Sequence, residues 1–148
     1  MSGVDPRVLE GIPHRPPFLW VDEIVALEGD RIVTRKRVDP DLDVFRGHYP
    51  DFPITPGVLV CEAIFQSGAL LLAQRAREEL AAGLLPVMTR IKDTRFRAMV
   101  RPGDVLDIEV QLDDALSKLY HLSGKAAVAG KVAVTSAFAV ALAPKPSE

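Results

Sequence analysis

The 148-residue sequence predicts an α+β fold in which one long helix is wrapped by a curved antiparallel sheet. Two regions of alternating apolar residues, 19–38 and about 85–143, favour strands. A single segment of helical character, residues 55–83, separates them. Because no internal repeat or low-complexity stretch divides the sequence, we expect a single domain covering residues 1–148.

The first strand pair is predicted from residues 19–38. The runs LWVDEIVALE and RIVTRKRV flank Gly29-Asp30, and a glycine-aspartate step between two strand-like runs is a hairpin signal. The preceding PHRPP, residues 13–17, is rich in turn-forming residues. We therefore expect an irregular segment followed by a hairpin.

The segment 55–83 carries helix signals at both ends. Thr55 suits the N-cap, Pro56 suits the first helical position, and Gly83 suits the left-handed position after the last turn. The first half is apolar on nearly every face, the exceptions being Glu62, Gln66 and Ser67. A helix that is apolar on every face is buried on every face, so this helix should lie inside the sheet.

The region after residue 85 predicts the rest of the sheet. In the run VLDIEVQL the alternating apolar residues share one face, namely Leu106, Ile108, Val110 and Leu112. The last run, KVAVTSAFAVALA, follows a tight-turn signal at Ala129-Gly130. Strands joined by short turns give an antiparallel meander.

Composition excludes several classes of protein. The net charge of −2 and the pI near 5.9 give no reason to expect nucleic acid or an anionic membrane as partner. With one cysteine, and histidines only at positions 14, 48 and 121, neither a disulfide framework nor a metal site is expected. The start lacks a secretory pattern, and no apolar run approaches the roughly 18 residues of a membrane span. We expect a cytoplasmic protein.

The segment DPDLDVFRGHYPDFPITP, between the first strands and the helix, is the first candidate for function. Four prolines stiffen it, and long irregular segments of compact domains are frequently functional. It carries His48, and histidine is the side chain best suited to proton exchange near neutral pH. The alternative, which composition alone favours, is a hydrogen-bonded loop histidine without a chemical role.

Glu62 is the second candidate, because it lies between Cys61 and Ala63 in the apolar half of the helix. Desolvation disfavours the charged form of a carboxyl group, and a protonated carboxyl can act as a general acid. A structural ion pair with an arginine explains the residue equally well. Gln66, one turn later on the same face, is expected to hydrogen-bond to Glu62 or to a backbone group.

The start of the helix is the third candidate. Gly57 and Val58 present backbone N–H groups at the positive end of the helix dipole, where they could polarise a carbonyl oxygen. Glycine also lets a ligand approach closely. Thr55 would occupy one of these N–H groups if it caps the helix. Ordinary helix-start chemistry is the alternative.

The segment TRIKDTRFRAMVR is a local basic patch in an otherwise acidic protein. It carries five positive charges, Arg90, Lys92, Arg95, Arg97 and Arg101, against Asp93 alone. Such a patch can steer an acidic partner toward its surface. A solvated strand face is the alternative interpretation.

The run GHYPDFPITPGVLVCEAIFQ, residues 47–66, is similar to the signature of the FabZ-type 3-hydroxyacyl-[acyl-carrier-protein] dehydratases. In that signature a histidine, prolines at fixed offsets, Pro-Gly, Glu and Gln correspond here to His48, Pro50, Pro53, Pro56-Gly57, Glu62 and Gln66. The runs IPHRPPFLWVD and RFRAMVRPGDVLDIEV also resemble the family, so the resemblance covers nearly the whole chain. Glu rather than Asp at position 62 resembles the FabZ type more than the FabA type.

The resemblance implies the hotdog fold, a long helix rolled in an antiparallel sheet. It further implies a homodimer formed by joining sheets edge to edge, often assembled as a trimer of dimers. In such dimers the catalytic histidine and glutamate come from different subunits.

The resemblance also assigns roles to the candidate residues. His48 would remove a proton from C2 of a 3-hydroxyacyl thioester, and Glu62 would protonate the departing hydroxyl group, with no metal or other cofactor. Gly57, Val58 and Gln66 would form the substrate-binding site. The residues that contact the acyl carrier protein would be Lys92, Arg95, Arg97 and Arg101.

Two other functions remain open from the sequence. A hotdog thioesterase also uses a carboxylate on the central helix, but it releases a free acid. A non-catalytic partner subunit that docks acyl carrier protein would have the same fold.

Overall fold

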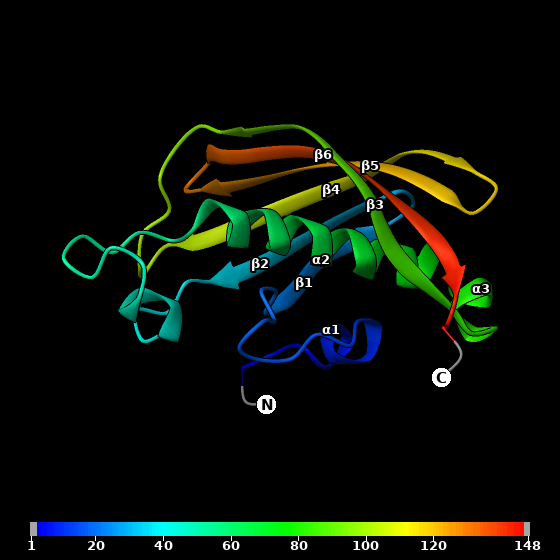
Figure 1. The fold of residues 1–148 in the computed structure, drawn as a ribbon, viewed down its shortest axis with the longest axis horizontal. Coiled ribbons are helices and arrows are strands. Elements are labelled where there is room, and N and C mark those ends of the chain that lie inside the picture. The colour runs from blue at the N-terminus through cyan, green and yellow to red at the C-terminus, as the bar shows by residue number, and fades with distance from the viewer. Residues whose placement is uncertain (1–2, 147–148) are drawn as a thin grey trace.

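The computed structural model describes residues 3–146 as one six-stranded antiparallel sheet curved around a long central helix (Figure 1). The helices are α1 (Pro6–Gly11), α2 (Gly57–Arg75) and α3 (Arg77–Ala81), with a 3-10 turn η1 (Asp43–Arg46). The strands are β1 (Glu23–Glu28), β2 (Arg31–Arg37), β3 (Leu84–Phe96), β4 (Val105–Leu116), β5 (Leu119–Val128) and β6 (Lys131–Pro144). Their order in the sheet is β1-β2-β4-β5-β6-β3. The predicted fold class is confirmed.

Both predicted hairpins form where the turn signals stand. Gly29, at φ +59°, turns β1 into β2, and Glu28 pairs with Arg31. Between β5 and β6, Ala129 and Gly130 both adopt positive φ, +50° and +82°. Two successive residues at positive φ match the right-handed twist of the flanking strands. The turn sets the pairing of Val128 with Lys131, and a bulge between Ala126 and Ala127 shifts the register beyond it.

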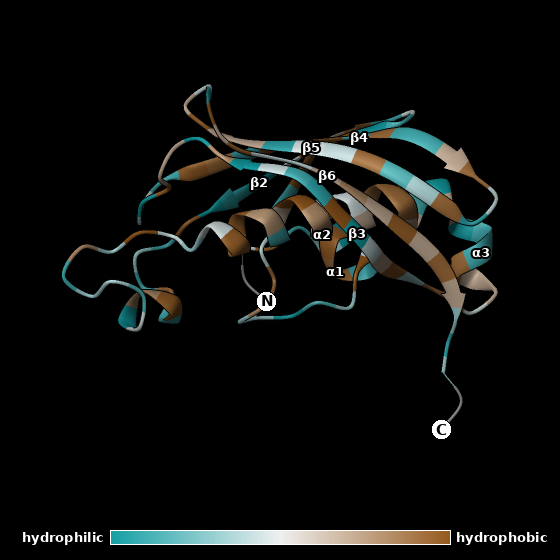
Figure 2. Cartoon of the chain, turned by 45° about the horizontal axis from the view of Figure 1, so that its top comes forward, coloured by the Kyte–Doolittle hydropathy of each residue, from teal (hydrophilic) through white to brown (hydrophobic). Residues whose placement is uncertain are grey.

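Helix α2 lies in the concave side of the sheet, close against β5 and β6. A Cβ at Gly68 would come within 2.7 Å of the Phe138 ring, and a Cβ at Gly124 within 2.5 Å of the Ile64 side chain. Only glycine allows this approach of helix to strand. Figure 2 shows the apolar residues concentrated along α2. The core of the protein is the contact between this helix and the inner face of the sheet.

The start of α2 differs from the prediction. Pro56, not Thr55, is the N-cap residue, and the helix begins at Gly57. The Thr55 backbone N–H donates to the carbonyl oxygen of Val100 at 2.7 Å, which ties Thr55 to the loop before β4. Its hydroxyl is buried and has no hydrogen-bond partner among the described residues. The tertiary contact with Val100 thus overrides the capping preference of threonine.

The end of the helical segment also differs, because it is not continuous to Gly83. The helix stops at Arg75, the buried Ala76 leaves helical geometry at φ −116° and ψ 35°, and the short α3 follows. No residue of α3 is buried. Gly83 does adopt the predicted left-handed conformation, at φ +98°.

Helix α2 is long and apolar enough, by length and composition, to cross a membrane, which the sequence analysis did not expect. In the structure more than half of its most apolar window is buried inside the protein. A core helix enclosed by a sheet meets the same length and composition criteria as a membrane span, so these criteria do not identify one here.

Candidate functional site

His48 lies in the loop between η1 and α2 and has one defined hydrogen bond. Its Nδ1 is 2.8 Å from the carbonyl oxygen of Ile54. Because a carbonyl oxygen can only accept, Nδ1 carries the proton and Nε2 presents its lone pair. The ring meets Tyr49 edge-on at 4.8 Å between centroids. His48 is therefore held in the tautomer that can accept a proton at Nε2.

The cavity beside His48 measures about 620 Å³. Its lining comprises Asp43, Val44, Arg46, Gly47, His48 and Pro56. Pro56 is the cap residue of α2, so the helix start and the histidine border the same space.

Glu62 projects from α2 into a different cavity of about 290 Å³. Apart from Glu62 itself and Gln66, the lining is His14, Phe18, Phe65, Ala69, Pro86, Met88 and Val140. The carboxyl side chain is 21% exposed, so it reaches solvent through this cavity. Among the described residues no arginine pairs with Glu62, which argues against the structural ion pair left open above.

Gln66 orients the Glu62 carboxyl. The side-chain oxygen of Gln66 accepts from the backbone N–H of Trp20 at 2.8 Å, and its Nε2 donates to the carbonyl oxygen of Phe18, also at 2.8 Å. These backbone partners fix which end of the amide is oxygen. The same Nε2 donates to Glu62 Oε2 at 2.9 Å, as predicted from the spacing on the helix.

The proton of a neutral Glu62 belongs on Oε1. Oε2 accepts from Gln66, whereas Oε1 takes part in no hydrogen bond or ion pair within residues 3–146. An acidic proton on Oε1 is therefore free to be donated to a ligand. Gln66 itself is only 1% exposed, so it acts on Glu62 and on two backbone groups from beneath the cavity.

The sequence analysis missed His14. Its Nε2 lies 3.8 Å from Glu62 Oε2, and its ring stacks on Phe18 with centroids 6.2 Å apart. The spacing of the three histidines predicts no metal site and gives His14 no other role. The signal that could have found it is its place in the run IPHRPPFLWVD, which resembles the family start.

The start of α2 keeps free backbone donors. No hydrogen bond of the Gly57 or Val58 N–H occurs among the described residues, and Thr55 does not cap the helix. A Cβ at Gly57 would lie 2.6 Å from the Phe96 ring, so this ring rests directly on the glycine. The Val58 side chain is 71% exposed. The helix start can thus offer N–H groups to a carbonyl oxygen.

His48 and Glu62 line different cavities of the described chain. An acid and a base that both act on one small substrate must lie within hydrogen-bond reach of it. The cavities of one chain therefore do not place both residues around one substrate.

The predicted basic patch is exposed. Lys92 and Arg95 lie on β3, Arg97 follows it, and Arg101 precedes β4. None of these four residues forms an ion pair within the described part of the chain. Arg97 and Arg101 border a cavity of about 350 Å³ together with Lys131, which adds a further positive charge.

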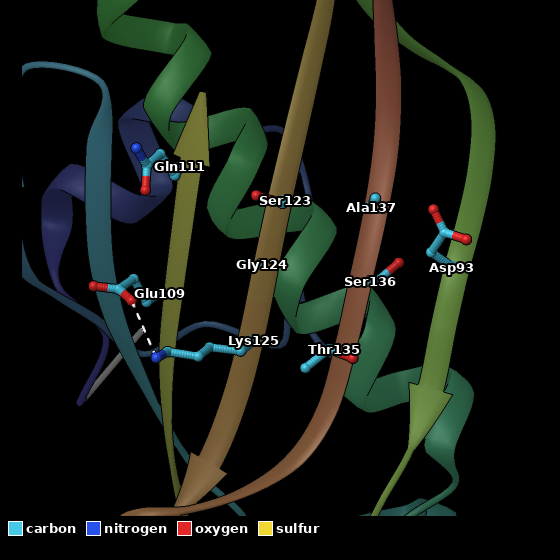
Figure 3. Close-up of a pocket in the computed structure, with 9 residues that line it drawn as sticks. All are labelled: Asp93, Glu109, Gln111, Ser123, Gly124, Lys125, Thr135, Ser136 and Ala137. Carbon is cyan, nitrogen blue, oxygen red and sulfur yellow. Dashed lines mark ion pairs between the residues drawn. The ribbon is translucent and has the colours of Figure 1, made fainter. Parts of the chain in front are cut away.

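A further hollow of about 360 Å³ lies on the outer face of the sheet (Figure 3). Polar side chains of β4, β5 and β6 line it, and Lys125 pairs with Glu109 at 3.5 Å. No candidate residue borders it. Nor do the described residues contain a group of three or more His, Cys, Asp or Glu side chains placed to hold a metal ion.

Comparison with known proteins identifies the family of this chain. A model of the FabA-like domain matches residues 12–137. The 3-hydroxyacyl-[acyl-carrier-protein] dehydratase FabZ of Geobacillus thermodenitrificans is 39% identical over 137 residues, 92% of each chain. The FabZ of Symbiobacterium thermophilum is 46% identical over 105 residues, 70% of this chain and 72% of that one.

Solved structures of low sequence identity share the fold. The dehydratase heterocomplex ApeI:P from Xenorhabdus doucetiae matches with a TM-score of 0.76 at 20% identity, covering 93% of this chain and 91% of that one. A hypothetical thioesterase with coenzyme A from Streptococcus pneumoniae matches with a TM-score of 0.64 at 14% identity, covering 84% and 88%. With the predicted hotdog architecture in place and curated FabZ relatives along nearly its whole length, the chain belongs to the FabA-like family of dehydratase domains.

Proposed function

We propose that this protein dehydrates a (3R)-3-hydroxyacyl thioester, carried by acyl carrier protein, to the trans-2-enoyl thioester in fatty-acid or related lipid biosynthesis. His48 Nε2 takes the proton from C2, and Glu62 Oε1 gives a proton to the 3-hydroxyl, which leaves as water. The observation that carries the proposal is that the hydrogen bonds of each side chain leave free the atom that the reaction needs. His48 has a free lone pair because Nδ1 is bound to Ile54, and Glu62 has a free Oε1 because Gln66 holds Oε2.

The helix start activates the substrate in this proposal. The N–H groups of Gly57 and Val58 donate to the thioester carbonyl oxygen, which acidifies the protons on C2 and stabilises enolate character. Elimination then needs neither a metal nor a redox cofactor, since no oxidation occurs and the carbonyl is polarised by backbone donors.

The active assembly is a homodimer, on this proposal, with each site using His48 of one subunit and Glu62 of the other. Strand β3 supports it: it is a 13-residue edge strand, and 11 of its residues are exposed. Its exposed residues include the large apolar side chains Leu85, Val87, Met88 and Ile91. Natural edge strands are usually short or charged, so the apolar first half of this long edge, before the charges at 90–95, favours pairing with a second copy of the chain. Three such dimers could assemble further.

The partner that delivers the substrate is acyl carrier protein, an acidic protein. The unpaired charges of Lys92, Arg95, Arg97 and Arg101 support this docking, because a basic patch raises the encounter rate with an acidic surface. The reaction takes place in the cytoplasm, with no membrane or nucleic acid involved.

The test follows enoyl-thioester absorbance when the protein meets 3-hydroxybutanoyl acyl carrier protein. Appearance of the conjugated product, lost in His48→Ala and Glu62→Gln, is the expected result. Free thiol without enoyl product would identify a thioesterase and overturn the proposal. A protein that binds the carrier but leaves the substrate unchanged would be the non-catalytic subunit.

A further inference from the structure

His14 faces Glu62 across the 290 Å³ cavity from the irregular segment that precedes β1. Its ring stacks on Phe18 at an interplanar angle of 18°, which sets the direction of the ring edge. The side chain is 29% exposed, and the nitrogen nearest Glu62 is Nε2. Whether this ring can donate a hydrogen bond to the Glu62 carboxyl group depends on which of its nitrogens carries a proton.

The two nitrogens of His14 have different surroundings. Nδ1 is inaccessible to solvent and has no hydrogen-bond partner among the described residues. A buried N–H without an acceptor costs about 1–3 kcal/mol, so the neutral ring keeps its proton off Nδ1. The proton then lies on Nε2, which is 3.8 Å from Glu62 Oε2.

Oε2 of Glu62 is thus faced by two donors, Gln66 Nε2 at 2.9 Å and His14 Nε2 at 3.8 Å. The strands that border the cavity contribute Pro86, Met88 and Val140, none of which titrates. Beside Glu62 on the helix, burial raises the pKa of the Cys61 thiol, with a smaller contribution from the Glu62 charge, so this thiol stays neutral. The donors are aimed at the oxygen that does not carry the acidic proton.

We propose that His14 is a positioning residue that acts through Glu62, by donating Nε2–H to Oε2 as Glu62 loses its proton. This inference rests on the proposed dehydration. In that step the Oε1–H proton moves to the 3-hydroxyl, the C3–O bond breaks and its electron pair leaves with water. The C2–H electron pair becomes the C2–C3 double bond, and His48 holds the C2 proton. Negative charge therefore develops on the Glu62 carboxylate, where the 3.8 Å contact can shorten and strengthen.

The experiment compares two substrates and two variants. His14→Leu removes the donor, whereas His14→Gln places an amide N–H near the position of Nε2. Each protein is assayed with 3-hydroxybutanoyl pantetheine, whose leaving group needs a proton, and with 3-chlorobutanoyl pantetheine, whose chloride leaves without one. The spontaneous elimination of chloride is measured without enzyme and subtracted.

His14→Leu is expected to lower kcat for the 3-hydroxyacyl substrate by about 10- to 100-fold, with little change in KM, which is less than the loss of a donor that contacts a developing oxyanion directly because His14 acts through Glu62. Turnover of the 3-chloroacyl substrate should stay within about twofold of wild type, which also shows that the variant is folded. His14→Gln should recover most of the lost kcat.

Three results overturn this inference. Equal losses for both substrates would make His14 a structural residue, a change confined to KM would make it a substrate contact, and no loss would leave it without a role. A wild-type protein that turns over the chloro but not the hydroxy substrate would instead contradict the proposed function itself.

Discussion

At the scale of single residues, Gln66 connects the cavity that holds Glu62 to the backbone of the segment before β1. It satisfies the Trp20 N–H and the Phe18 carbonyl oxygen while it holds Glu62 Oε2. Since Trp20 is buried, its N–H has no route to water if the amide is removed. The same side chain therefore contributes both to stability and to the orientation of the Glu62 carboxyl group.

We predict that Gln66→Leu lowers the free energy of unfolding by about 2–4 kcal/mol, because the buried Trp20 N–H and the partly buried Phe18 carbonyl oxygen both lose their partner. Gln74→Leu, at an exposed position of the same helix, serves as control and should change it by less than about 0.5 kcal/mol. Urea denaturation of both variants measures the difference. Equal effects of the two substitutions would contradict the assigned role of Gln66.

His14 illustrates why residues of this kind escape prediction from sequence. Glu62 and Gln66 could be paired in advance, because a spacing of four residues puts them on one helix face. His14 lies 48 residues before Glu62, and its role depends on which side of the helix its segment crosses. Local spacing carries no information on such a contact.

At the scale of elements, Asp5 ties α1 to the first strand. Its Oδ1 accepts from the Arg7 backbone N–H at 2.9 Å, and its Oδ2 accepts from the Ile24 N–H at 3.1 Å. The Arg7 guanidinium, which also donates to the carboxylate, is the largest cause that lowers the pKa of Asp5 from 3.8 to about 2. The backbone donors add to this effect.

The lowered pKa of Asp5 predicts that its contribution to stability depends on pH. Because the pKa of Asp5 is lower in the folded than in the unfolded chain, its contribution is complete above about pH 4 and is lost as pH falls toward 2. Arg7 is largely exposed, so solvent screening reduces the contribution to about 1–2 kcal/mol. Asp5→Asn should therefore destabilise the protein at pH 7 but hardly at pH 2, as measured by urea denaturation at both. A difference that is independent of pH would refute the assignment.

Some ends of helices and strands are determined by the local sequence, and others by tertiary contacts. The turns at Gly29-Asp30 and Ala129-Gly130 were predictable because their residue types suit the turns that form. The start and end of α2 were not. Thr55 is withdrawn from capping by Val100, and the helix breaks at the buried Ala76, and both are properties of the tertiary structure.

At the scale of the whole molecule, the separation of His48 from Glu62 predicts complementation. Mixing His48→Ala with Glu62→Gln subunits should restore activity, since each mixed dimer contains one site with both residues intact. Random exchange gives mixed dimers in half of the population, so about a quarter of wild-type activity is expected. Purification through two different tags in succession isolates the mixed dimers, which should show about half of wild-type activity because one of their two sites is intact. An inactive mixture that contains mixed dimers would show that each site uses His48 and Glu62 of the same chain.

The exposed edge of strand β3 also affects each newly made chain before it assembles. In the proposed homodimer a second copy covers this edge, and until then its unpaired backbone can template contacts with any other extended segment. An association rate constant of about 10⁶ M⁻¹s⁻¹ and a subunit concentration of about 1 μM give an unprotected lifetime of about one second. Tenfold lower expression would lengthen that lifetime tenfold. A newly made chain should thus depend most on chaperones when the concentration of other copies of the same chain is low.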